Sequence, residues 1–198
     1  MAGCQEGADE VSERTEEIGF TAEVPAAEPL LKAQSAENPI NGLTRPGIEP
    51  LVLRIPAIGV EADVLHLGTT ESGAMAVPGN IADVSWFAPG YRPGQNGRAV
   101  IAGHVDGPNG PAVFWDLPEL KAGDEIIVEG ADKNLVFRVE AMESTALDDI
   151  DVKAVFGYRS SPELVLITCS GSYSESLGTR EERLIVYAGF SEEVSKAE

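Results

Sequence analysis

The chain has 198 residues and a formal net charge of −19, which excludes the basic surface that nucleic-acid binding requires. Its length and its 43% hydrophobic content allow one folded domain with a substantial core plus an appendage. The 21 glycines and 13 prolines favour short strands joined by turns over a helical bundle. No stretch of the sequence is apolar enough to predict a membrane-spanning helix, and two widely separated cysteines do not suggest a disulfide framework.

Residues 1–49 are predicted to form an acidic, flexible tether. They combine Glu, Ala, Pro and Ser with few large apolar residues, a composition that cannot offset the entropy lost on ordering. The first four residues, Met1 to Cys4, resemble the end of a bacterial lipoprotein signal, in which a small residue precedes a lipidated cysteine. The apolar stretch that should precede Cys4 is missing, so an expression remnant is an equal alternative. A trimmed signal would imply a location outside the cytoplasmic membrane.

From residue 51 onward, short apolar runs alternate with turn signals, a pattern that predicts strands. The strands expected in the first half cover residues 51–55, 60–67, 74–77 and 98–103. Trp86 and Phe87 are expected to pack at a corner, and residues 113–120 to contain a small helical turn.

In the second half we expect a hairpin of 125–128 with 135–139, a short helix within 148–156, a strand at 164–169, a polar loop at 170–182 and a last strand at 183–188. Neither an internal repeat nor a βαβ alternation is present. These patterns predict an all-β barrel or sandwich with small helices in its loops.

Three side chains at the ends of predicted strands could carry chemistry. His104 and Cys169 each follow a strand, and Arg183 begins one. A thiol is a weak nucleophile until a base or a positive neighbour favours its thiolate, and a histidine supplies either. A guanidinium can stabilise the negative charge that develops on the carbonyl oxygen during attack on an amide. Together the three would form a thiol acyl-transfer site.

Each of these residues also has a purely structural interpretation. Cys169 could be a small packed hydrophobe, His104 a loop residue whose ring is held by Asp106, and Arg183 part of a surface ion pair. His66 lies in an alternating run and is expected on the outer face of a strand.

The chain resembles the sortases, the cysteine transpeptidases of Gram-positive cell surfaces, in three blocks. These are Ala102–His104, Val165–Cys169 and Arg183–Val186; the second usually begins with Thr, where this chain has Val165. The opening strand at 54–60 and the Phe114–Asp124 stretch also fit. The resemblance implies a closed, mostly antiparallel β-barrel at residues 50–192 with short helices in the loops, followed by a short tail at 193–198.

By this resemblance, Cys169 is the nucleophile, His104 the general acid and base, and Arg183 the group that positions substrate and stabilises the oxyanion. Thr168 would line the substrate pocket. The implied reaction cleaves an LPXTG-like signal of a surface protein between Thr and Gly and transfers the acyl group to an amine, such as that of a cell-wall precursor, without cofactor or metal. The implied location is the extracellular face of the membrane, through an anchor or lipid missing from this chain.

The segment from Gly103 to Phe114 looks most like the actinobacterial class F sortases. L,D-transpeptidases also use Cys and His on β-rich folds, but they carry Arg two residues beyond the thiol, where this chain has Gly171. A non-catalytic barrel that binds sorting signals or wall polymer is the remaining alternative.

Overall fold

The computed structural model describes residues 45–71 and 73–196. The lipoprotein-like start with Cys4, and the predicted tether up to residue 44, lie outside the described residues.

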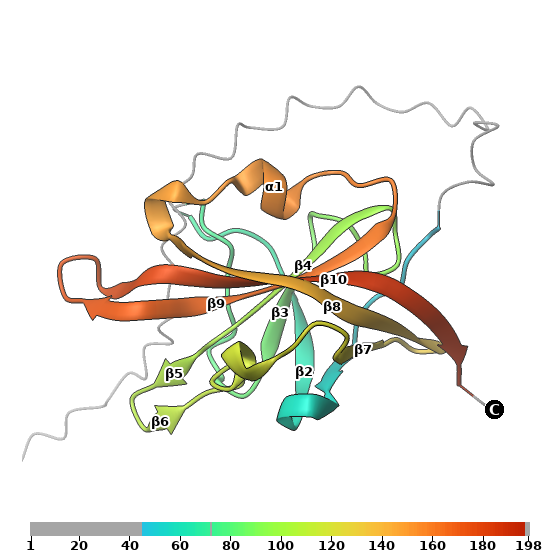
Figure 1. The fold of residues 1–198 in the computed structure, drawn as a ribbon, viewed down its shortest axis with the longest axis horizontal. Helices are drawn as coiled ribbons and strands as arrows, with labels where there is room; N and C mark the ends of the chain where they lie inside the picture. Colours follow the sequence, from blue (N-terminus) through green and yellow to red (C-terminus); the bar gives the residue numbers. More distant parts are fainter. Residues whose placement is uncertain (1–44, 72, 197–198) are drawn as a thin grey trace, which may run out of the picture.

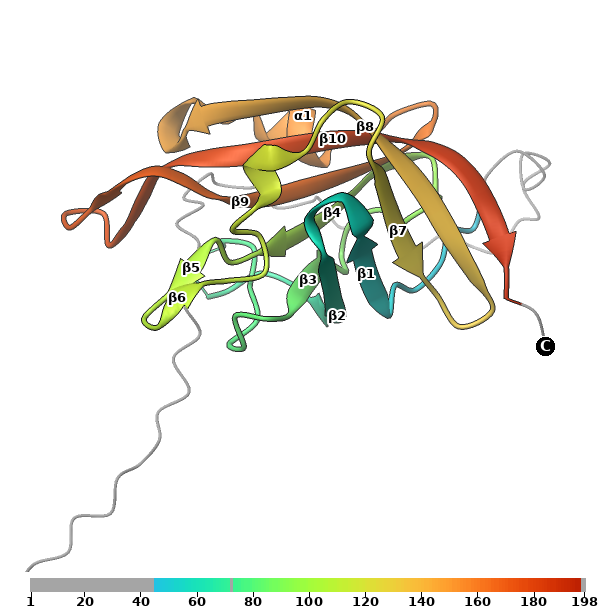
Figure 2. The ribbon, with the colours of Figure 1, turned by 60° about the horizontal axis from the view of Figure 1, so that its bottom comes forward.

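Eight strands close into a barrel in the order β1–β2–β3–β4–β9–β10–β8–β7 (Figures 1 and 2). The pairs β2–β3 and β4–β9 are parallel, and the other six pairs are antiparallel. The predicted closed, mostly antiparallel barrel is therefore confirmed. The strands are β1 (Val52–Ile55), β2 (Val60–Leu67), β3 (Val84–Phe87), β4 (Gly97–Gly103), β7 (Glu125–Glu129), β8 (Lys133–Ala146), β9 (Pro162–Ser174) and β10 (Thr179–Ser195).

Short elements occupy the connections between the strands. They are the 3-10 turns η1 (Pro56–Ile58), η2 (Leu117–Glu119) and η3 (Leu147–Asp149), the helix α1 (Val152–Phe156), and the small hairpin of β5 (Asp106–Gly107) and β6 (Gly110–Pro111). The Asp151 carboxylate caps α1 by accepting a hydrogen bond from the backbone N–H of Ala154 at 3.0 Å. Helical turns thus occur in both loops where the sequence predicted them.

Three expectations about local structure were wrong. Residues 74–77 form no strand; a single bridge joins Met75 to Thr69. Trp86 and Phe87 are the end of β3 rather than a corner. The polar segment 170–182 is largely strand, because β9 continues to Ser174 and β10 begins at Thr179. This hairpin projects beyond the barrel (Figure 1). Because water reaches both of its faces, its strands can consist of polar residues, which in a sequence normally indicate a loop.

The hydrophobic residues form two clusters on opposite faces of β9. Leu164 and Leu166 point into the barrel and belong to the main core. Val165 and Ile167 point outward and pack against a second cluster that includes Val77 and Val155. Both faces of this strand are therefore buried, as its uninterrupted apolar sequence predicts.

Packing against the barrel begins before residue 50, where the sequence predicted the domain to start. Ile48 is buried in the main core, and the Arg45 guanidinium lies over the ring of Phe190 at 4.3 Å from its centroid. At the other end, β10 continues to Ser195, into the predicted tail, and pairs there with Lys133. In the described part of the chain no helix has the length and apolarity needed to span a membrane.

Candidate active site

Strand register brings the three predicted residues into one row. Cys169 on β9 lies directly opposite Arg183 on β10. In the parallel pair β4–β9, Ala102 lies opposite Ile167, and two further residues along each strand lead to His104 and Cys169. Since side chains two apart share a face of a sheet, all three residues belong to the outer face that carries the second cluster.

The sequence predicted Cys169 at the end of its strand. In the structure Cys169 lies within β9, because β9 continues five residues beyond it. Its side chain is half-buried and packs against the second cluster. The sulfur lies 3.8 Å from Thr179 Oγ1. The thiol therefore has a rigid apolar support and remains partly accessible, which a nucleophile that attacks a bound peptide requires.

His104 directly follows β4 and is half-buried. The preceding Gly103 permits a close approach, since a Cβ there would lie 2.8 Å from the Phe114 ring. His104 Nε2 is 2.8 Å from the carbonyl oxygen of Pro78. A carbonyl only accepts hydrogen bonds, so Nε2 carries a proton and Nδ1 is left to exchange one. The interpretation in which Asp106 holds this ring is wrong, because Asp106 binds Arg180 instead.

Arg183 is fully buried, which excludes the surface ion pair considered from the sequence. Its Nη1 donates to the carbonyl oxygens of Arg180 at 2.9 Å and Glu182 at 2.8 Å, and Nη2 donates to Thr179 Oγ1 at 3.3 Å. Its Nε is also buried and finds no acceptor among the described residues. Burial lowers the pKa of Arg183, and the charge that Cys169 carries when it is ionised opposes that shift.

Thr168 is buried and faces away from the row. As the residue next to Cys169 in a strand, it points to the opposite face, where its Oγ1 donates to the carbonyl oxygen of Gly103 at 2.8 Å. This bond fixes the end of β4 to β9. The hydroxyl therefore braces the two segments that carry His104 and Cys169.

Thr179 was missed by sequence reasoning, although its hydroxyl contacts both Cys169 and Arg183. It lies in the segment that the sequence predicted to be a polar loop. Only the antiparallel pairing of β9 with β10 brings it beside the thiol. No motif in the sequence marks it.

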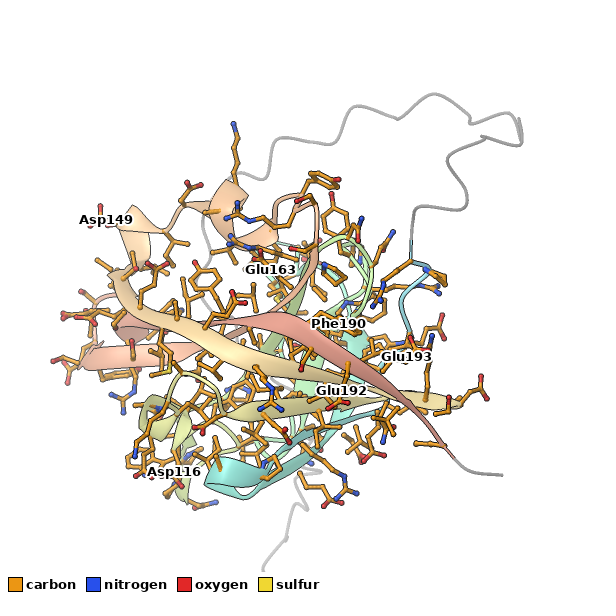
Figure 3. The ribbon with its side chains drawn as sticks, turned by 45° about the vertical axis from the view of Figure 1, so that its right-hand side comes forward. Asp116, Asp149, Glu163, Phe190, Glu192 and Glu193 are labelled. Atoms are coloured by element: carbon orange, nitrogen blue, oxygen red, sulfur yellow. The ribbon has the colours of Figure 1, made fainter. Side chains whose placement is uncertain are left out.

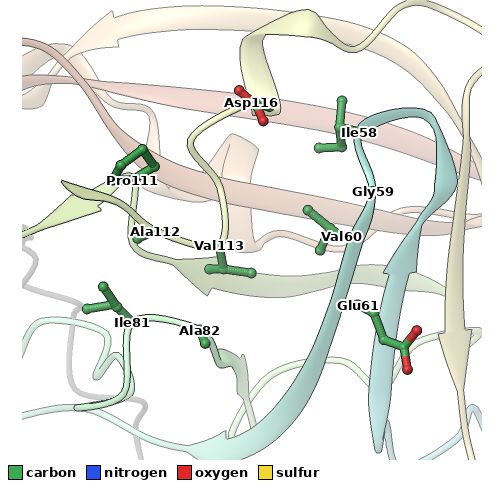
Figure 4. Close-up of a pocket in the computed structure, with 10 residues that line it drawn as sticks. All are labelled: Ile58, Gly59, Val60, Glu61, Ile81, Ala82, Pro111, Ala112, Val113 and Asp116. Carbon is green, nitrogen blue, oxygen red and sulfur yellow. The ribbon is translucent and has the colours of Figure 1, made fainter. Parts of the chain in front are cut away.

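A separate hollow of about 440 Å³ lies between the turn from η1 into β2 and the segments 81–82 and 111–116 (Figure 4). The apolar residues Ile58, Val60, Ile81 and Val113 line it, together with Glu61 and Asp116. None of the three residues of the row contributes to its lining.

Acidic side chains are spread over separate elements rather than gathered at one place. Figure 3 labels examples on different segments, including Asp116, Asp149 and Glu192. Within residues 45–71 and 73–196, no group of three or more His, Cys, Asp or Glu side chains is arranged to hold a metal ion.

Comparison with known proteins identifies the family. The family model described as Sortase domain matches residues 53–190. The chain belongs to the sortase family. A comparison with curated protein sequences gave no match.

Solved sortases of several classes share the fold. Listeria monocytogenes sortase A has a TM-score of 0.58 at 14% identity, covering 75% of this chain and 92% of that one. A sortase E mutant from Streptomyces avermitilis has a TM-score of 0.55 at 24% identity, covering 74% and 91%. Streptococcus pneumoniae sortase C has a TM-score of 0.57 at 20% identity, covering 75% and 71%. The match of structure across these classes confirms the sortase barrel.

Proposed function

We propose that the protein is a cysteine transpeptidase that cleaves an LPXTG-like sorting signal between Thr and Gly and transfers the new acyl group to an amine. The observation that carries this proposal is the row of His104, Cys169 and Arg183 on one face of the barrel. Membership of the sortase family gives the reaction class. Site geometry supports the assignment of roles to these residues.

In the first step, the Cys169 thiolate, whose proton His104 holds, attacks the threonine carbonyl carbon of the signal and forms a tetrahedral oxyanion. Arg183 is suited to stabilise this oxygen, because its guanidinium lies beside the thiol and its Nε–H has no acceptor among the described residues. The C–N bond then breaks, His104 protonates the departing glycine amine, and a thioester remains on Cys169.

In the second step, an incoming amine attacks the thioester carbonyl. His104 accepts the proton that the amine loses, the C–S bond breaks, and Cys169 leaves as the thiolate. A new amide bond joins the surface protein to the acceptor, and the resting site is restored. Acid–base work of this kind by a positioned histidine is worth about 10² to 10⁴ in rate.

A packed apolar layer lies next to the row and supports its reacting groups. Ala102, Ile167 and Ile185 form the adjacent row across β4, β9 and β10, and they belong to the second cluster. These three side chains are buried, so they hold Cys169 in place rather than contact the peptide. Thr168 then contributes through the hydrogen bond of its hydroxyl to Gly103 rather than by contact with the peptide.

The finer subtype and location belong to the same proposal. The Gly103–Phe114 segment favours a class F enzyme of actinobacterial type. Since sortases act at the cell surface, we place this one on the outer face of the cytoplasmic membrane, with proteins bearing LPXTG-like signals as substrates and a cell-wall amine as acceptor.

Product analysis of a reporter peptide tests this function. An LPXTG peptide incubated with the protein should yield a fragment ending in Thr, and added triglycine should convert this fragment to the triglycine adduct. The Cys169→Ala variant is the matched control and should yield neither. Peptide binding of equal affinity in both proteins without any cleavage would favour the non-catalytic alternative.

A further inference from the structure

Arg180 contacts all three segments that carry the row. Its Nη2 donates to Asp106 Oδ2 at 2.5 Å, two residues after His104. Its Nη1 donates to the carbonyl oxygen of Gly171 at 2.6 Å, two residues after Cys169. Its own carbonyl oxygen accepts the hydrogen bond from Arg183 Nη1.

A β-bulge directs Arg180 toward these partners. Between the Tyr173–Arg180 and Ser170–Glu182 pairs, β9 contains two residues, Gly171 and Ser172, where β10 contains one. Gly171 has a φ of +72°, a left-handed conformation that glycine adopts readily. A bulge with glycine in this conformation bends the strand and re-aims nearby groups. Here it turns the Gly171 carbonyl toward the guanidinium of Arg180.

The other partner lies on the β5–β6 hairpin. Figures 1 and 2 show this hairpin on the same side of the molecule as the projecting β9–β10 hairpin. Asp106 begins β5, and the following Gly107 is in contact distance of Ile81, since a Cβ at Gly107 would lie 3.1 Å from that side chain. The hairpin therefore packs against Ile81, in the connection before β3, and is held by Arg180 through Asp106.

We propose that Arg180 and Asp106 form a clasp that sets the spacing between His104, Cys169 and Arg183, so that Arg180 is a positioning residue of the transpeptidase. The inference rests on the function proposed above. Three bonds from one residue fix the histidine loop, the segment after the nucleophile and the buried arginine relative to one another. Arg180 reaches the reaction through these residues and does not need to touch substrate.

The clasp is built for geometry rather than for stability. The side chains of Arg180 and Asp106 are 25% and 39% exposed, and an ion pair with this much solvent contributes little to folding. Catalysis is more sensitive, since misplacing a reacting group by about 1 Å can cost roughly 10²-fold in rate. Loss of the clasp should therefore lower turnover far more than it lowers stability.

A double-mutant cycle tests the clasp. Arg180→Ala, Asp106→Ala and the double variant are compared in a Cys4→Ser background, so that Cys169 is the only thiol. Arg138→Ala is the matched control, since Arg138 on β8 pairs with Glu125 on β7 at 2.7 Å and is also partly exposed, but lies seven residues along β8 from Thr145, the partner of Arg183. Steady-state turnover of the LPXTG peptide and the pH profile of Cys169 alkylation by iodoacetamide are measured for each.

We expect each single variant to lower kcat by about 10²-fold with KM changed little, and the double variant to be no worse than either single one. Asp106→Asn retains an oxygen acceptor for Arg180 and should recover part of the loss. The pH profile of Cys169 alkylation should shift in both single variants. The Arg138→Ala control should have the turnover and the alkylation profile of the parent protein.

Asp106→Ala within twofold of the parent in both kcat and alkylation would overturn the proposal. A large loss in Arg180→Ala without one in Asp106→Ala would also overturn it, because the bond between Arg180 and Asp106 would then play no part in the spacing. If the parent protein turned over no peptide, the proposed function would fail, yet the alkylation profiles would still test the clasp.

Discussion

The two faces of β9 are equally buried at residues 164–167 but have different roles. On the inner face, Leu164 and Leu166 belong to the barrel core and pack against side chains from other strands. On the outer face, Val165 and Ile167 are covered by loops, and the next residue on that face is Cys169. The inner face packs against other barrel strands. The outer face packs in part against segments that connect the strands, and it carries the reactive residue Cys169.

This difference explains which face of a strand can carry a nucleophile. A nucleophile needs rigid support beneath it and access from solvent, and the outer face of β9 offers both at Cys169, whose side chain is half-buried. The inner face offers only support. We therefore expect substitutions on the inner face to change stability alone, and substitutions on the outer face to change turnover as well.

The largest effect is expected at the thiol itself. Cys169→Ala removes the nucleophile and should abolish peptide cleavage, while the half-buried methyl group preserves the packing, so the melting temperature should change little. Peptide cleavage followed by chromatography and thermal unfolding followed by circular dichroism measure the two properties. Cleavage near the wild-type rate would remove the outer face from the mechanism.

Arg183 tests whether the row requires a planar donor. Arg183→Lys should lose about 10² to 10³-fold in kcat, nearly as much as Arg183→Ala, because an ammonium cannot reproduce the fork that binds two backbone carbonyls and Thr179. Steady-state kinetics of both variants decide this. An active lysine variant would make Arg183 a simple point charge and move attention to Arg180.

A pair of neighbouring alanine substitutions compares the two faces directly. Leu166→Ala on the inner face should cost about 2–5 kcal/mol in the free energy of unfolding and leave KM unchanged. Ile167→Ala on the outer face should cost a similar amount and also raise KM for the sorting peptide, because Ile167 belongs to the cluster that supports Cys169. Urea unfolding and peptide kinetics measure both. Equal effects on KM would erase the functional distinction between the faces.

The smallest effect is expected at Tyr187, at the far end of the outer face. Burial and a hydrogen bond to Glu143 raise the pKa of Tyr187 above its usual value of 10.0. A raised folded-state pKa stabilises the protein below pH 10, and this contribution is lost as pH rises through the folded-state pKa. Tyr187→Phe should cost about 1 kcal/mol at neutral pH and reduce the loss of stability above pH 10. Urea unfolding across pH detects this.

The sequence predicted the barrel because its core strands are short apolar runs bounded by turn residues, as in the Leu164–Cys169 stretch. It predicted the row because His104 and Cys169 terminate such runs. It did not predict that β9 and β10 extend past Cys169, since the polar residues of a solvated hairpin look like a loop. Thr179 and Arg180 lie in that extension, where the pairing of β9 with β10 and the bulge at Gly171 bring them to the site.

The most direct test of the central claim is the intact mass of the protein after incubation with an LPXTG peptide. The account predicts an acyl adduct on Cys169, equal in mass to the fragment ending in Thr less one water, which hydroxylamine releases as the hydroxamate and triglycine as the amide. An unmodified protein, or an adduct that persists in Cys169→Ala, would contradict a thioester mechanism at this site.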